Sequence, residues 1–348
     1  MKTGNIIRAG LLAIILSLVA MASWEFHLRH QGNKIYYDDN EAMWAHYRGM
    51  VYEPSDQSTV FLGSSRIKFD LDIPTWQSIT GNHVIQLANV GSDPVPYLID
   101  LADDKKFKGT LVVDVTEELF FSDFSPADVA TDKKINYFKK ITPTQRFSFQ
   151  VNHVLESQFV FLDQDRYSIN SMLDKLPLVH RPGIYPEPDF PDDFGVVDFN
   201  RQSYMTPRFV ADTSLQNRVK AIWVCLGRMM AGPPPSTGKL DSFFHVIKVA
   251  TDKIKSRGGQ VLFLRTPSSG PMLEGEKKGF AKSQYWDKLL AVTGCPGIFY
   301  SDYPSLSNFV CPEWSHLKPE DAKIYTKELI KILQKDKGWT FNKKSNSI

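Results

Sequence analysis

The pattern of apolar residues changes along the chain, from one long run at the amino terminus to short runs between polar segments. Residues 9–22 read AGLLAIILSLVAMA, fourteen consecutive uncharged and mostly apolar positions that follow Lys2 and Arg8. A helix that packs on the core of a soluble domain has a polar face, and this run has none. Basic residues before such a run are typical of an export signal or a membrane anchor.

Two interpretations of this segment remain open from the sequence. Ala20-Met21-Ala22 fits a small-x-small cleavage site, which would release a secreted protein. Alternatively, the 19 residues from Ile6 to Trp24 extend over about 28 Å as a helix, close to the hydrocarbon thickness of a membrane. Arg8 would then reach the headgroups and Trp24 the outer interface. We expect residues 1–24 to be a signal anchor or signal peptide, residues 25–55 a juxtamembrane segment, and the body to be extracytoplasmic, on the periplasmic or cell-surface side.

The rest of the chain alternates between two kinds of apolar pattern. Short apolar runs predict strands at Thr59–Leu62, His83–Leu87, Gly109–Val115 and Gln260–Arg265. Helical spacing predicts helices at about Pro96–Ala102, Asp241–Arg257 and Pro319–Gln334. Strands that alternate with helices indicate an α/β fold with a parallel sheet.

A long excursion separates the third and fourth predicted strands. It covers about residues 121–239, is rich in Pro, Phe, Tyr and Asp, and closes with the proline run of residues 232–238. This is too long for a plain loop, so we expect a mostly helical insertion or cap. The predicted organisation is a domain over residues 56–340 that contains the insertion, followed by a polar tail at 341–348.

Charge and cysteine content exclude several function classes. The chain has 41 basic and 39 acidic residues, and without Lys2 and Arg8 the body has 39 of each. A neutral body without a basic tract argues against nucleic acid as a partner. No Cys/His cluster has metal-ligand spacing, so we expect no metal. An exported chain can pair Cys295 with Cys311, but the sequence leaves that pairing open.

The first candidate for chemistry is Gly63-Ser64-Ser65-Arg66, directly after the first predicted strand. Parallel α/β sheets place their sites at the carboxyl ends of the strands. Glycine allows a sharp turn there, and the N–H groups of the following helix can stabilise an oxyanion. In the alternative interpretation, Ser64 or Ser65 merely caps that helix.

The second candidate is Glu313-Trp314-Ser315-His316, just before the last predicted helix. A nucleophilic serine needs a base, and the base needs an orienting carboxylate. Of the eight histidines, only His316 has an acidic residue three positions earlier. A turn of that spacing can direct both side chains toward one site, although a surface Glu and His near a helix start are also common.

Together, the two motifs resemble the SGNH (GDSL-like) hydrolase superfamily over the span from about Thr59 to Gln334. The resemblance implies a three-layer, flavodoxin-like parallel sheet, with Ser65 as nucleophile, His316 as base and Glu313 as acid. It also implies an oxyanion hole formed by the N–H groups of Ser65 and Gly91, and no metal or organic cofactor.

The sequence departs from the family pattern at three places. Ser64 replaces the usual Asp before the nucleophile, and Glu313 replaces the usual Asp of the acid position. The third block lacks its oxyanion-hole Asn, because the strand leads into Asp114-Val115-Thr116-Glu117-Glu118. The loss of one such donor typically costs on the order of 10²–10³ in rate, unless Thr116 or a backbone N–H substitutes for it.

The Gly-Ser-Ser-Arg variant behind an N-terminal anchor is similar to exported cell-envelope members of the superfamily, such as the proteins of D-alanyl-lipoteichoic acid synthesis and alginate acetylation. This implies an esterase acting on O-acyl groups of a surface glycan or a similar ester. The alternatives are an O-acyltransferase that works with a membrane-bound O-acyltransferase, and a non-catalytic assembly or polymer-binding protein. Candidates for substrate contact are Arg66, Thr116 and Arg265, although Arg66 can equally pin the first helix to the sheet and Arg265 can belong to an ordinary turn.

Overall fold

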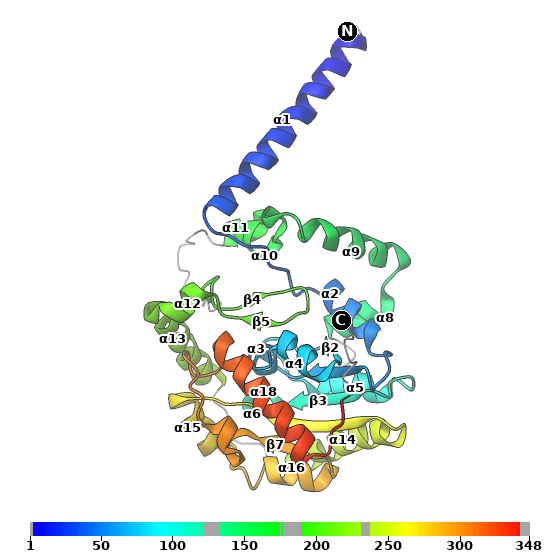
Figure 1. Cartoon of the computed structure of the whole chain (residues 1–348), viewed down its shortest axis with the longest axis vertical. Coiled ribbons are helices and arrows are strands. Elements are labelled where there is room, and N and C mark those ends of the chain that lie inside the picture. The colour runs from blue at the N-terminus through cyan, green and yellow to red at the C-terminus, as the bar shows by residue number, and fades with distance from the viewer. Residues whose placement is uncertain (1–2, 122–131, 175, 177–188, 231–236, 342–348) are drawn as a thin grey trace. The chain divides into compact units, whose positions relative to one another are not determined.

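The structure is a computed structural model of the chain, and it describes residues 3–121, 132–174, 176, 189–230 and 237–341 (Figure 1). The chain forms two compact units. The N-terminal unit combines residues 1–38 with 142–185, and the sheet unit combines residues 39–141 with 186–348. Residues 142–185, which lie inside the expected insertion, are grouped with the N-terminal helix.

The sheet unit is built on five parallel strands. These are β1 Ser58–Leu62, β2 His83–Gln86, β3 Thr110–Asp114, β6 Gln260–Arg265 and β7 Gly297–Phe299, in the spatial order β2-β1-β3-β6-β7. Counted along the chain, this is the 2-1-3-4-5 order of a common doubly wound fold. The predicted α/β class and its four strands are confirmed. The fifth strand, β7, was not predicted, because a run of three residues is too short to give a clear pattern.

The strands bury side chains on both faces, because two groups of helices cover them. Alternate residues such as Phe61, Val112 and Leu264 join a core cluster that includes Leu329. On the other face, Phe263 contacts Phe120, with 6.1 Å between ring centroids. One group of packed helices is α3 Ser65–Asp70, α4 Ile73–Thr80 and α18 Pro319–Asp336, and the other is α5 Val95–Asp103, α14 Thr237–Ser256 and α16 Trp286–Thr293 (Figure 1). Continuous burial along a strand follows from such two-sided cover.

The described part of the expected insertion is divided between the units. In the sheet unit it includes α8 Lys133–Lys140, α12 Pro207–Ala211 and α13 Thr213–Met230, and an antiparallel pair formed by β4 Val196–Val197 and β5 Ser203–Tyr204. The sheet unit also contains α2 Glu41–Met50, α6 Glu117–Phe120, α15 Gly270–Gly279, α17 Pro304–Ser307 and the 3-10 turn η2 Tyr300–Asp302. Most of the proline run and of the polar tail lies outside the described residues.

The N-terminal unit contains the long apolar helix α1, Thr3–His30, with α9 Pro143–Glu156, η1 Val160–Leu162, α10 Gln164–Tyr167 and α11 Ile169–Asp174. Among the described residues, α1 is the helix that is long and apolar enough to cross a membrane. It continues past the expected boundary at Trp24. This helix is compatible with an anchor and with a signal sequence.

Candidate active site

Ser65 lies at the carboxyl edge of the sheet because the chain turns sharply after β1. Strand β1 ends at Leu62, and α3 begins at Ser65. A Cβ atom on Gly63 would lie 2.6 Å from Cβ of Asp114 and 2.9 Å from the side chain of Ile67. Glycine is therefore required at this position, because the turn passes too close to β3 for any side chain.

Ser64 occupies the N-cap position of α3, but its side chain makes no capping hydrogen bond. Its Oγ instead lies 2.7 Å from Oγ1 of Thr116, and both residues are buried. As the first residue of the helix, Ser65 has no intrahelical acceptor for its N–H. The capping interpretation is therefore wrong, and the N–H of Ser65 points out of the helix end.

Three side chains from the two ends of the sheet unit, those of Ser65, His316 and Glu313, form a chain of hydrogen bonds, called the relay below. The hydroxyl Oγ of Ser65 lies 2.8 Å from Nε2 of His316. On the other side of the imidazole, Nδ1 lies 2.9 Å from Oε1 of Glu313. With the proton on Nδ1, the ring donates to the carboxylate and its Nε2 accepts from the serine hydroxyl. This is the geometry of a nucleophile, a general base and an orienting acid.

The turn that carries Glu313 and His316 is fixed by its backbone. The N–H of His316 donates to Oε1 of Glu313 at 2.6 Å. Between them, Trp314 has a φ of 83°, in the left-handed region that costs a non-glycine residue about 1–3 kcal/mol. The carbonyl of Trp314 accepts from the N–H of Ser269 at 2.8 Å, which helps to hold the turn in this conformation.

Aromatic side chains enclose the imidazole. The ring centroid of His316 lies 4.4 Å from that of Phe69, 5.6 Å from that of Phe194 and 6.0 Å from that of Trp223. Trp223 also donates its indole N–H to Oε2 of Glu313. His316 and Glu313 are both buried, whereas Ser65 is partly exposed. His316 and Glu313 are therefore shielded from water, and Ser65 is the member of the relay that faces outward.

A second carboxyl lies beside this turn. Oδ1 of Asp70 accepts from the N–H of Leu317 at 2.8 Å. Complete burial raises the pKa of Asp70 to about 7, and the nearby His316 opposes this increase. Asp70 thus links the end of α3 to the residue after the base.

Arg66 and Arg265, two of the candidates for substrate contact, are buried in ion pairs. Arg66 is 2% exposed and pairs with Glu276, and Nε of Arg265 donates to Glu117 at 2.9 Å. Arg265 also pairs with Glu276. These guanidinium groups connect α3, β6, α6 and α15, which fits the pinning role considered for Arg66. A substrate contact by either residue stays a prediction.

The remaining oxyanion candidates, Thr116 and Gly91, lie on the segments that follow β3 and β2, the strands on either side of β1. Thr116 donates its hydroxyl to Oδ2 of Asp114 at 2.9 Å, so that hydrogen is not available to a substrate. Gly91 lies in the turn after β2 with a φ of 65°, and among the described residues no acceptor takes its N–H. The role of Gly91 in an oxyanion hole stays a prediction.

No group of three or more His, Cys, Asp or Glu side chains suited to a metal ion occurs among the described residues. The three cysteines are free thiols, so Cys295 and Cys311 are not paired in this structure.

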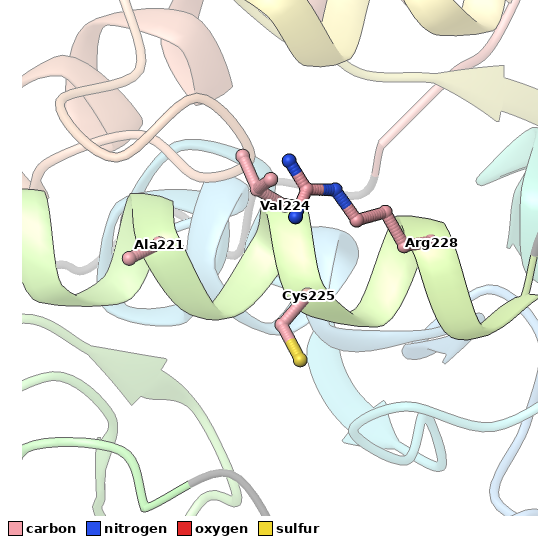
Figure 2. A pocket seen from close by; sticks show the side chains of 4 residues that line it. All are labelled: Ala221, Val224, Cys225 and Arg228. Carbon is pink, nitrogen blue, oxygen red and sulfur yellow. The ribbon is translucent and has the colours of Figure 1, made fainter.

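A cavity of about 550 Å³ lies along one face of α13, lined by Ala221, Val224, Cys225 and Arg228 (Figure 2). Ser65, His316 and Glu313 are not among the residues that line this cavity.

The sequence alone did not indicate Phe69, Asp70 or Trp223. Their positions carry no spacing signal, since Trp223 lies 90 residues from the carboxylate that it contacts.

The chain matches no protein-family model and no curated protein.

Proposed function

We propose that this protein is an extracytoplasmic serine esterase of the SGNH type, which removes O-acyl groups from a cell-envelope glycan or a similar ester. The observation that carries the proposal is the relay from Ser65 through His316 to Glu313, with 2.8 Å and 2.9 Å between successive partners. Residues 251 positions apart in the chain meet at hydrogen-bonding distance, and the second motif supplies a base and an acid.

The proposed reaction proceeds through an acyl-enzyme. His316 takes the proton of Ser65 at Nε2 while Oγ attacks the acyl carbon, and the N–H groups of Ser65 and Gly91 stabilise the oxyanion. Collapse of the tetrahedral intermediate breaks the ester bond, and His316 returns the proton to the departing alkoxide. Water then attacks the acyl-enzyme with His316 as base, which releases the acid and restores Ser65.

The N-terminal helix supports the location in this proposal. The apolar segment of α1 is long enough to cross a membrane and is not buried in the structure. A chain held by such an anchor acts near the membrane surface, where acylated envelope polymers are present. The resemblance to exported SGNH proteins points to the same class of substrate.

One observation favours transfer over hydrolysis as a second candidate. The base and the acid are enclosed by Phe69, Phe194 and Trp223, which exclude water from the imidazole. Water then reaches His316 only from the side of Ser65, so a polymer hydroxyl bound on that side can displace water as the acceptor of the acyl group. In that version the protein is an O-acyltransferase supplied by a membrane-bound O-acyltransferase.

Labelling with a fluorophosphonate tests the serine chemistry. We expect the full chain to react covalently, Ser65→Ala to lose labelling, and Ser64→Ala to retain it. Ser64 is a matched control because it is the adjacent hydroxyl and is bonded to Thr116 rather than to His316. Equal labelling of wild type and Ser65→Ala would assign the reaction elsewhere. No labelling of either would favour the non-catalytic alternative.

The two catalytic versions differ in the acceptor. With p-nitrophenyl acetate as acyl donor, hydrolysis releases acetate at a rate that does not depend on added oligosaccharide. Transfer predicts an acetylated oligosaccharide, detected by mass spectrometry, and a matching fall in free acetate. Acetylated product that persists in Ser65→Ala would show that it does not arise from this site.

A further inference from the structure

The N-terminal unit leaves large apolar side chains uncovered on short helices as well as on α1. On α9, Phe147 is 68% exposed and Val154 is 60% exposed, and Val151 and Leu155 are also exposed. On α11, Ile169, Met172 and Leu173 are exposed as well. Contiguous apolar surface of this kind marks a site of interaction.

The exposed residues of α9 form one face. Their spacing from Phe147 is i, i+4, i+7 and i+8, which places them along a single stripe of the helix. The opposite side carries the less exposed residues Phe149, His153 and Glu156. The ring of His153 lies 5.9 Å from that of Tyr37 in the same unit. Because α9 packs through this second side, its apolar stripe points away from the rest of the N-terminal unit.

Hydrogen bonds tie the end of α9 to the end of the apolar run in α1. Glu25 accepts from the N–H groups of Val160 and Phe161 at 3.1 Å and 3.2 Å. Arg29 donates to the carbonyl of Gln158 at 2.8 Å. Glu25 follows Trp24 directly, so these contacts lie where a membrane-spanning α1 leaves the hydrocarbon. Figure 1 shows α9 running across the direction of α1 rather than along it.

We propose that α9 lies in the interfacial layer of the membrane that α1 spans, with Phe147, Val151, Val154 and Leu155 inserted among the lipid acyl chains. The inference rests on α1 as a membrane anchor and not on the serine chemistry. A helix transverse to the anchor, tethered at the interface and apolar on its outer face, matches the arrangement of interfacial amphipathic helices.

The attraction is apolar rather than electrostatic. Helix α9 carries one basic residue, Arg146, and one acidic residue, Glu156, besides His153. Surface electrostatics weaken as salt rises, whereas burial of apolar side chains does not. Lipid contact by α9 is therefore expected to be the same at low and at high ionic strength, and with zwitterionic lipid alone.

Nitroxide labels on the full chain test the proposal. The protein is reconstituted at one copy per phosphatidylcholine nanodisc, in a Cys225→Ser background that removes the exposed native thiol. Single labels are placed at Val151→Cys and Val154→Cys on the apolar stripe and at Asn152→Cys as the matched control, because Asn152 is exposed beside the stripe. Collisions with oxygen, which concentrates in lipid, are compared with those of a water-soluble nickel chelate.

We expect a severalfold higher ratio of oxygen to nickel accessibility at positions 151 and 154 than at position 152, unchanged in 1 M salt. Nickel accessibility at all three positions would place the stripe in water and overturn the proposal. Protection of positions 151 and 154 from both reagents would overturn it too, because another protein would then cover them. A label at Leu16→Cys tests the anchor itself, and failure there removes the premise. Fluorophosphonate labelling of the same variants reports the serine chemistry separately.

Discussion

Ser65 and Arg66 are neighbours on the first turn of α3, yet they belong to two different polar systems. Ser65 is partly exposed and forms one hydrogen bond, to a histidine that can accept its proton. Arg66 is buried and is held by Glu276, by Oγ of Ser315 at 3.3 Å and, more distantly, by Glu117 at 3.8 Å. The first system is arranged for proton transfer, and the second is an ion-pair cluster that joins four elements.

The comparison shows that the charged groups near Ser65 are paired with one another inside the protein. The carboxylates of Glu276 and Glu117 balance the guanidinium groups of Arg66 and Arg265 inside the protein. The hydrogen-bonded group of Ser65, His316 and Glu313 instead has a partly exposed residue, Ser65, at one end. Substitutions in the relay are therefore expected to change activity with little change in stability, and substitutions in the ion-pair cluster to do the reverse.

The largest effect is expected for Glu313→Gln. The glutamine side chain keeps the size of glutamate but does not fix the imidazole in the tautomer with the proton on Nδ1. We expect about a 10⁴-fold loss in the rate of p-nitrophenyl acetate hydrolysis, as for the equivalent change in other triads. Glu320→Gln, an exposed position in the first turn of α18, is the control. A loss below tenfold would remove Glu313 from the relay.

Arg66→Met tests the ion-pair cluster. The substitution leaves the buried Glu276 with one guanidinium partner fewer, and breaking a buried ion pair costs about 3–5 kcal/mol of unfolding free energy. Lys277→Met breaks an exposed pair with Glu274 on the same helix, which costs about 0–1 kcal/mol. Denaturant unfolding of the two variants in detergent provides the comparison. Equal losses of unfolding free energy in the two variants would show that the buried ion-pair cluster contributes no more to stability than the exposed pair does.

The contrast also shows which features a sequence reveals. The strands were predictable because two-sided burial leaves near-continuous apolar runs such as residues 260–265. The pairing of Glu313 with His316 was predictable because they lie three residues apart on one turn, and their catalytic roles stay a prediction. The partner of Arg66 was not, because Glu276 lies 210 residues away in a helix with no distinguishing pattern. The contact of α1 with η1, the turn that follows α9, was not predictable for the same reason, since only the folded chain brings residues 25 and 160 together.

Asp70 lies between the two systems and is expected to make stability depend on pH. Its pKa is raised to about 7 by burial, above the ordinary value of 3.8. The folded protein therefore binds this proton more tightly than the unfolded chain does, so the group's unfavourable contribution grows as pH rises from about 4 to 7. Asp70→Asn keeps an acceptor for the N–H of Leu317 and removes the charge.

The stability of Asp70→Asn relative to wild type is expected to improve between pH 5 and pH 8 by on the order of 2 kcal/mol. Thermal or denaturant unfolding at the two pH values measures this difference. Asp103→Asn, which removes an exposed carboxylate paired with Lys253, is the control. If the curves of wild type and Asp70→Asn stay parallel across this range, Asp70 does not titrate there.

The smallest effect is expected where the insertion touches the relay, at Trp223. Trp223→Phe keeps an aromatic ring beside His316 but removes the N–H that donates to Oε2 of Glu313. A hydrogen bond to a charged group contributes about 1.5–3 kcal/mol. We expect only part of this free energy to stabilise the transition state, so that loss of the bond lowers kcat about 10-fold. Rates of p-nitrophenyl acetate hydrolysis at saturating substrate measure it.

Trp76→Phe is the matched control for this change. Trp76 is a fully buried indole in the core beneath α18, and its Nε1 has no hydrogen-bond partner among the described residues. Both substitutions remove the same atoms, so a general loss of packing would lower stability in both. Only Trp223→Phe should reduce kcat at a given stability, because only Trp223 contacts the acid of the relay. If both variants lose activity in proportion to their stability, Trp223 packs beside the triad without positioning Glu313.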